Sequence, residues 1–127
     1  MQIRVYYEDT DCGNIVYYAN YLKFMERSRT EHFRDRGIDL AHWMAKGVQF
    51  VVIEAHLKYR NSARYNDLLD VDSELTDLSF ASITFSTSVY RQKGPLLVKG
   101  EVRLACVDLD NHIKRIPDEI REMLGWT

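Results

Sequence analysis

Three carboxylates stand at the end of the first apolar stretch of this sequence, shortly before a predicted helix. Glu8, Asp9 and Asp11 follow the alternating residues 3–7, and a Gly-Asn turn separates them from an aromatic-rich helix start. Carboxylates in this position face the positive end of the helix dipole, where backbone N–H groups are free. A carboxylate near free N–H groups offers two components of an acyl-transfer site, an activated oxygen and an oxyanion hole.

The residue types alone leave two interpretations of Asp9 and Asp11 open. One of the two serves chemistry and the other structure, or both are turn and capping carboxylates of the kind common before any helix. Cys12 is a second candidate nucleophile, but it would need an adjacent base, usually His, and none is close in the sequence. Three tyrosines are candidates either for an acyl pocket or for packing of the helix start: Tyr17, Tyr18 and Tyr21.

Two other motifs begin with the same residues, and the surrounding sequence excludes both. The run Asp9–Asp11 resembles the nucleophile motif of aspartate-based phosphatases, which need a doubly wound domain. No alternating strand–helix–strand pattern follows it here. The run also begins like a calcium-binding loop, but Asn20 stands where that loop needs its bidentate Glu.

Length and composition predict a single domain over residues 1–127 and exclude several classes of partner. The 127 residues carry a formal net charge of −2 with both signs interspersed, which argues against nucleic-acid binding. No apolar run is long enough to cross a membrane, and charged residues interrupt the only candidate signal peptide, so we expect a cytoplasmic protein without membrane insertion.

The cysteines and histidines predict neither a metal site nor a cofactor. Cys12 and Cys106 have no metal-type spacing, and Cys106 lies in a strand pattern, where we expect it to be a small buried residue. No two of the histidines have the i,i+4 spacing of a zinc-binding helix; they are His32, His42, His56 and His112.

Hydrophobic periodicity predicts a long helix followed by strands. Helical spacing runs from Asn20, a plausible cap, to Gly37, and a second short helix covers 39–45. Pro117 opens a last helix. Alternation of period two predicts strands in the segments 3–7, 48–59, 69–75, 83–89 and 98–106.

The four long strands predict an antiparallel meander with one apolar face, covered by the long helix in an α+β arrangement. In the segment 48–59, strict alternation places Val51 and Leu57 on one face and Phe50 on the other. The stretch Val48–Val52 is therefore apolar on both faces, which predicts at least a homodimer. Gly100, at an inward position, is expected where the helix backbone comes closest.

The order Tyr-x-x-Asp-Thr-Asp-x-x-x-x-Val-Tyr-x-x-x-Tyr, followed directly by a long helix, resembles the 4-hydroxybenzoyl-CoA thioesterase family of the hotdog-fold superfamily. It most resembles the acyl-CoA thioesterases whose genes neighbour the Tol–Pal envelope system. The resemblance implies a hotdog fold, an antiparallel sheet wrapped around a long central helix. It also implies hydrolysis of an acyl-CoA or of an acyl carrier protein thioester by a homodimer or homotetramer.

The resemblance assigns roles to single residues. Asp11 matches the essential carboxylate of the family, a nucleophile or general base, and the backbone N–H of Tyr18 matches the oxyanion donor. Tyr18 replaces a usual His, but a backbone donor does not depend on the side chain. Apart from the resemblance, four basic residues at the ends of predicted strands are candidates for the phosphates of coenzyme A: Arg60, Arg64, Arg91 and Lys93. The alternative function is a hotdog module that binds or senses an acyl thioester without hydrolysing it.

Overall fold

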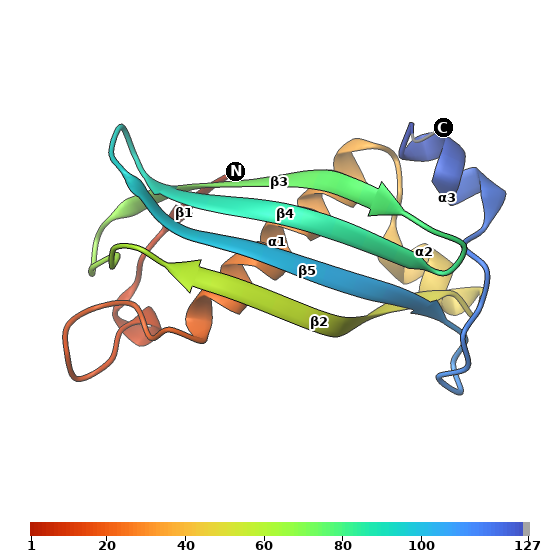
Figure 1. Ribbon diagram of the computed structural model, residues 1–127, viewed down its shortest axis with the longest axis horizontal. Coiled ribbons are helices and arrows are strands. Elements are labelled where there is room, and N and C mark those ends of the chain that lie inside the picture. Colours follow the sequence, from red (N-terminus) through yellow and green to blue (C-terminus); the bar gives the residue numbers. More distant parts are fainter. Residues whose placement is uncertain (126–127) are drawn as a thin grey trace.

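A computed structural model describes residues 1–125 as a five-stranded antiparallel sheet with a long helix packed along one face (Figure 1). The α+β arrangement predicted from the periodicity is confirmed. Among these residues no helix combines the length and apolar composition needed to cross a bilayer. The elements, in chain order, are β1 (Gln2–Arg4), the 3-10 helix η1 (Tyr7–Asp9), α1 (Asn20–Asp35), α2 (Leu40–Ala45), β2 (Gln49–Tyr59), β3 (Leu68–Leu78), β4 (Ser82–Arg91), β5 (Leu96–Val107) and α3 (Asp118–Met123).

The strand order is β1-β3-β4-β5-β2, so the prediction of a four-strand meander is wrong for β2. β1 occupies one side of β3 and β4 the other, which leaves β2 to pair with the free edge of β5. The connection formed by residues 60–67 therefore crosses the end of the sheet, past β5 and β4, a span of three strand spacings or about 14 Å. This crossing segment lies at the same end of the sheet as the residues that precede α1 (Figure 1).

A β-bulge in β2 changes which residues face α1. The pairing with β5 shifts register between Val52 and Glu54, so strict alternation fails at this point. Phe50 lies before the bulge and stacks on Phe33 of α1, with ring centroids 5.7 Å apart. Leu57 lies after the bulge and packs against the same helix-facing core. The sequence prediction that Phe50 and Leu57 lie on opposite faces is therefore wrong.

The core between α1 and the sheet has two apolar clusters, one toward each end of the helix. Cys106 is buried in one of them, as predicted, and burial raises the pKa of its thiol. Gly100 lies where a Cβ would come within 2.7 Å of the Met25 Sδ. The close approach predicted at Gly100 is thus made by a helix side chain rather than by the helix backbone.

The helix boundaries predicted at Gly37 and Pro117 are confirmed, whereas Asp39, predicted as the first residue of the second helix, caps it. Gly37 follows α1 with a φ of 81°, which glycine adopts without steric cost, and the Asp39 side chain accepts a hydrogen bond from the N–H of Ala41 at the start of α2. Pro117 directly precedes α3.

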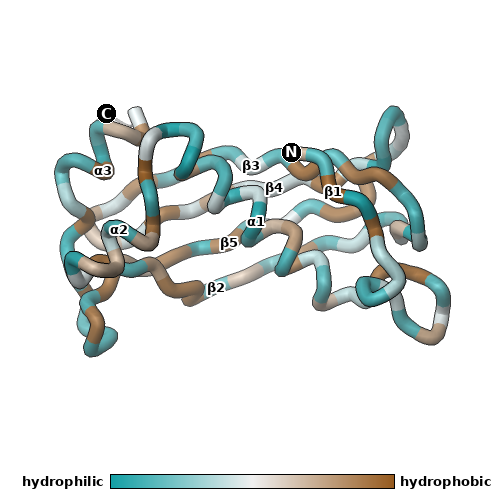
Figure 2. The backbone as a smooth tube through the Cα atoms, turned by 180° about the vertical axis from the view of Figure 1, so that it is seen from behind, coloured by the Kyte–Doolittle hydropathy of each residue, from teal (hydrophilic) through white to brown (hydrophobic). Residues whose placement is uncertain are grey.

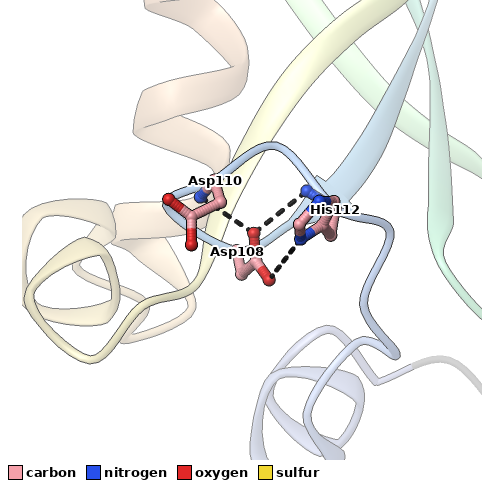
Figure 3. A group of neighbouring side chains, drawn as sticks. All are labelled: Asp108, Asp110 and His112. Atoms are coloured by element: carbon pink, nitrogen blue, oxygen red, sulfur yellow. Dashed lines mark hydrogen bonds and ion pairs between the residues drawn. The ribbon is translucent and has the colours of Figure 1, made fainter.

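The turn after β5 is organised by Asp108 (Figure 3). Its Oδ1 accepts hydrogen bonds from the backbone N–H groups of Asp110, at 2.9 Å, and His112, at 3.0 Å. The His112 N–H contributes most to lowering the pKa of the Asp108 carboxyl. The side chains of Asp108, Asp110 and His112 lie close together because of this turn, at the end of the sheet away from the segment that precedes α1.

Candidate active site

Asp11 is held in a tight turn between η1 and α1. Its backbone N–H donates to the carbonyl of Ile15 at 2.9 Å, and its carbonyl accepts from Asn14, whose φ is 64°. Its carboxylate Oδ1 accepts from the Gly13 N–H at 2.8 Å, and a Cβ on Gly13 would lie only 3.2 Å from this oxygen. The turn therefore fixes the Asp11 carboxylate from one side and leaves it exposed to a ligand.

Asp9 has a different environment, because it is buried and forms part of the scaffold. Its carboxylate accepts from the Tyr6 N–H at 2.8 Å and from the side-chain amide of Asn20 at 2.9 Å, and its carbonyl accepts from the Tyr17 N–H. Asn20 is the first residue of α1 rather than its cap, so the predicted capping role is wrong. The first strand also ends earlier than predicted, because Tyr7 begins η1.

The N-terminus of α1 presents a free backbone donor. Its N-cap residue, Ala19, makes no side-chain capping hydrogen bond. The N–H groups of Tyr17 and Asn20 donate to the carbonyls of Asp9 and Tyr17, whereas those of Tyr18 and Ala19 have no hydrogen-bond acceptor among residues 1–125. An unbonded N–H at the positive end of a 16-residue helix is suited to an oxygen that gains negative charge.

A cavity of about 240 Å³ brings the carboxylate and this helix end together. Three residues that the sequence analysis singled out, Asp11, Tyr18 and Tyr21, line it. The other lining residues are Ile15, Val16, Tyr59, Asn61 and Ser62. Tyr17, Arg60 and Arg64 are outside this lining.

Tyr59, Asn61 and Ser62 line this cavity but were not predicted from the sequence as site residues. The Tyr59 hydroxyl donates to the Tyr18 carbonyl at 2.9 Å, and burial raises the pKa of this phenol. Asn61 is oriented by a hydrogen bond from its Nδ2 to the Leu96 carbonyl at 3.1 Å. The sequence signal for Tyr59 was that of an aromatic residue at the end of a predicted strand, on the face turned toward the helix. Its contact with a residue 41 positions earlier depends on the fold.

The remaining predicted residues surround the cavity at different places. Tyr17 is exposed, its ring centroid lies 4.9 Å from that of Tyr18, and a side-chain hydrogen bond with Tyr18 raises its pKa. Arg60 lines a separate cavity of about 300 Å³, together with Lys58 and Lys99 on the face of the sheet away from α1. Arg64 is exposed beside the Asp11 turn, where its backbone pairs with Ile15.

This arrangement has the parts needed for attack on a carbonyl that carries a good leaving group. The Tyr18 N–H can stabilise an oxyanion, and the Asp11 carboxylate can act as a nucleophile or draw a proton from water. No histidine or cysteine lines the cavity.

Comparisons with known proteins agree with this fold. The sequence profile of the thioesterase-like superfamily matches residues 5–124. The acyl-CoA thioester hydrolase YbgC of Escherichia coli O6:H1 is 40% identical over 106 residues, which cover 84% of this chain and 79% of that protein. The acyl-CoA thioesterase YbgC of Haemophilus influenzae is also 40% identical, over 108 residues, with the same coverage of 84% and 79%.

The solved structure of the hypothetical protein TT1821 from Thermus thermophilus superimposes with a TM-score of 0.93 at 30% identity, covering 98% of this chain and 95% of that one. Together with the matched profile, this similarity covers nearly the whole chain rather than the Asp11 motif alone. The chain therefore belongs to the thioesterase-like superfamily and has the hotdog fold that its sequence motif predicted.

Proposed function

We propose that this protein hydrolyses the thioester bond of an acyl-CoA, releasing a free acid and coenzyme A. The observation that carries the proposal is that Asp11 and the unbonded N–H of Tyr18 line one cavity at the start of α1. The names of two relatives, an acyl-CoA thioester hydrolase and an acyl-CoA thioesterase at 40% identity, support the same substrate class.

In the proposed reaction, the Tyr18 N–H polarises the thioester carbonyl and stabilises the oxyanion that forms on it. Asp11 either attacks the carbonyl carbon to give a mixed anhydride, which water then hydrolyses, or draws a proton from the attacking water. The carbon–sulfur bond breaks in both routes, and the thiolate leaves with the bonding pair. A thiol pKa of roughly 8–9 makes this group a good leaving group, so no general acid is required.

The proposed substrate contacts extend away from this centre. Tyr21, together with Tyr59, forms the apolar wall for the first part of the acyl group, and Tyr17 extends that wall toward solvent. Arg60 and Arg64 remain candidates for the phosphates of coenzyme A. Arg60 is the stronger candidate, because Lys58 and Lys99 line the same cavity and outweigh the negative charge of Glu101 there.

A panel of acyl-CoA thioesters, with the matching acyl carrier protein thioesters, tests the proposal. Thiol release is followed with a disulfide reagent, and binding of the same compounds is followed by calorimetry. We expect turnover of at least one thioester. Saturable binding of acyl-CoA without any thiol release would favour the alternative, a module that binds or senses acyl thioesters.

We also propose that the functional unit is at least a homodimer, formed through β2. This strand is an edge of the sheet, and Val52 and Ile53 are 51% and 50% exposed in the single chain. Figure 2 shows the same feature as an apolar first half of β2 along an open edge of the molecule. A long apolar edge of this kind is a template for strand pairing with another chain.

A buried arginine beside this edge supports the same interface. Arg29 of α1 is only 8% exposed and lines a groove next to Val52, and burial lowers its pKa. No ion pair of its guanidinium is found in the described part of the chain, although Glu26 of the same helix acts on it at longer range and raises its pKa, and a buried charge without a close partner is unfavourable. Glu26 lines the same groove, so two copies related by a two-fold axis can place each Glu26 near the other copy's Arg29.

For the dimer, sedimentation velocity at micromolar concentration should show no species with the mass of one chain. Ile53→Asp should produce that species, because it places a charge in the apolar edge. Phe80→Asp is the matched control, since Phe80 is also an exposed apolar residue, 64% accessible, in the turn after β3. The proposed β2 interface would be wrong if the wild-type protein sedimented as one chain, or if both variants dissociated to the same extent.

A further inference from the structure

The connection between β2 and β3 forms a wall of the candidate site and also supports the Asp11 turn. Asn61 and Ser62 line the cavity. The Val16 N–H donates to the Ala63 carbonyl at 2.9 Å, immediately after the turn that holds Asp11. The position of this connection therefore helps to determine where the carboxylate lies.

The same connection holds the first turn of α1. The Ala63 N–H donates to the hydroxyl of Tyr21 at 3.1 Å, and both residues are buried. Ile15 pairs with Arg64 as an isolated β-bridge. Both parts of the site, the carboxylate turn and the helix end, are thus fastened to one short segment.

This segment is not part of the sheet, although it must cross the end of it. Its backbone is bonded to β5 and to the residue after β1 only near its two ends, where Arg60 and Asn61 donate to the Leu97 carbonyl and Asn66 donates to the Val5 carbonyl. Its middle is bonded to the segment that precedes α1 and not to the strands, so side chains are needed to fix that middle to the sheet over a span of about 14 Å.

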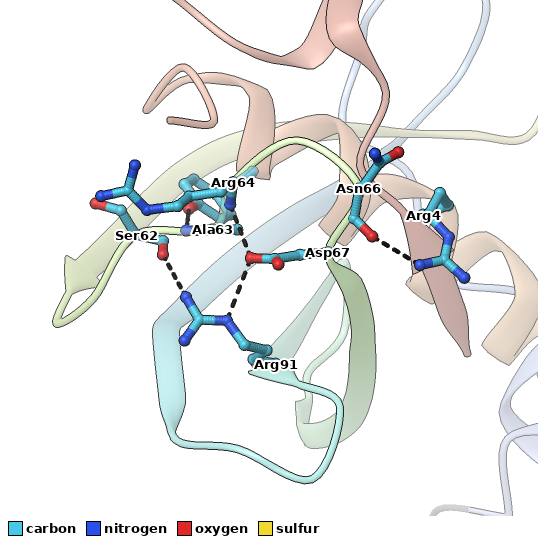
Figure 4. A network of polar contacts seen from close by, with 8 residues as sticks. Arg4, Ser62, Ala63, Arg64, Asn66, Asp67 and Arg91 are labelled. Carbon is cyan, nitrogen blue, oxygen red and sulfur yellow. Dashed lines mark hydrogen bonds and ion pairs between the residues drawn. The ribbon is translucent and has the colours of Figure 1, made fainter. Parts of the chain in front are cut away.

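Arg91, at the end of β4, supplies this attachment (Figure 4). Its Nη2 donates to the Ser62 carbonyl at 2.8 Å and its Nε donates to the Asp67 carboxylate at 3.2 Å. The same Asp67 oxygen accepts from the Arg64 N–H at 2.8 Å. One guanidinium therefore ties two points of the connection to the sheet, and its carboxylate partner ties a third.

We propose that Arg91 is a positioning residue of the thioesterase site, acting through Ser62 and Asp67 on the connection that holds Asp11 and α1. This role rests on the proposed function. A rival role for an arginine at this rim is binding of a coenzyme A phosphate, and the two roles predict different kinetics.

The test compares Arg91→Met with wild type on two thioesters of the same acyl group, one of coenzyme A and one of N-acetylcysteamine, which lacks the nucleotide. A positioning role predicts that kcat falls about tenfold to a hundredfold on both thioesters, because displacing reacting groups by about 1 Å has effects of this size. Arg91→Lys should restore only part of kcat, since a single ammonium does not reproduce the two-pronged contact of a guanidinium.

Arg121→Met is the matched control. The Arg121 Nη2 also ties a connection in place, donating to the carbonyls of Ser79 at 2.6 Å and Phe80 at 3.0 Å, but at the other end of the sheet. We expect a loss of thermal stability similar to that of Arg91→Met, with unchanged kcat. If both variants had the same kcat while wild type hydrolysed the thioesters, the positioning role would be wrong. A rise in KM for the coenzyme A thioester alone would instead support phosphate binding and overturn the proposal.

Hydrogen exchange gives a readout that does not depend on activity. In Arg91→Met we expect faster exchange of the amides in residues 10–16 and 60–67, and unchanged exchange in β5. Wild-type exchange rates in residues 10–16 would contradict the proposal even if no thioester were hydrolysed. Failure of the positioning role can therefore be separated from failure of the proposed function.

Discussion

Replacement of Asp11 by Asn should lower kcat for thioester hydrolysis by at least about a hundredfold, within the range for a lost general base. The fold should survive, because the amide oxygen can still accept the hydrogen bond from the Gly13 N–H, and the side chain is exposed. Thiol release measures the activity, and far-ultraviolet circular dichroism should match that of wild type. A variant that kept more than about a tenth of wild-type kcat would exclude Asp11 as the reacting carboxylate.

Asp9→Asn is the comparison for this result, because Asp9 is a carboxylate of the same segment with a structural environment. It accepts hydrogen bonds from the Tyr6 N–H and the Asn20 amide, and an Asn side chain can leave one of these donors without an acceptor. We expect a lower melting temperature, because the free energy of unfolding should fall by about 1–3 kcal/mol. The loss of kcat should be smaller than in Asp11→Asn.

Cys12 is adjacent to Asp11, so an experiment must distinguish the two as candidate nucleophiles. Cys12→Ser should keep most of the activity, since no histidine lines the cavity to hold the thiol as a thiolate. An alkylating agent that blocks the site through Cys12 should then have no effect on the serine variant. An inactive but well-folded Cys12→Ser protein would make the site a cysteine site.

The helices and long strands could be predicted from the sequence because their signals are local. Period-two alternation and the Gly37 and Pro117 boundaries need no knowledge of the partner strand. The position of β2 could not be predicted in this way, because it depends on which edge of the sheet β1 leaves free. The bulge after Val52 could not be predicted from the sequence either. A single added residue reverses the face of every later side chain without changing the composition.

The residues of the candidate site also fall into two groups, those that a local motif predicts and those that only the fold brings together. Asp11 and Tyr18 belong to one contiguous motif, so the sequence predicted both, and the structure places both at one cavity. Tyr59 joins them from the end of β2 and Asn61 from the connection that follows it, while Arg91 of β4 contacts the carbonyl of the neighbouring Ser62. These contacts depend on the crossing of residues 60–67 over the end of the sheet, which no local pattern encodes.

Replacing Tyr18 by Pro should reduce kcat by about 10²–10³-fold, a loss on the order of 3 kcal/mol of transition-state stabilisation, because proline removes the N–H that would stabilise the oxyanion. Tyr18→Ala keeps this N–H and should stay within a few-fold of wild-type kcat, although it loses the ring contacts with Tyr17 and Tyr59.

Ala19→Pro is the control for the backbone change itself. Ala19 has a φ of −75°, already within the range of proline, and it is the next residue along the same helix start. The loss in Tyr18→Pro should be in kcat rather than in KM, because the donor acts mainly on charge that develops in the transition state. If Tyr18→Pro and Ala19→Pro lost the same activity at equal melting temperature, the Tyr18 N–H would not be the oxyanion donor. The distinction is sharp because the three variants differ mainly in which backbone N–H remains.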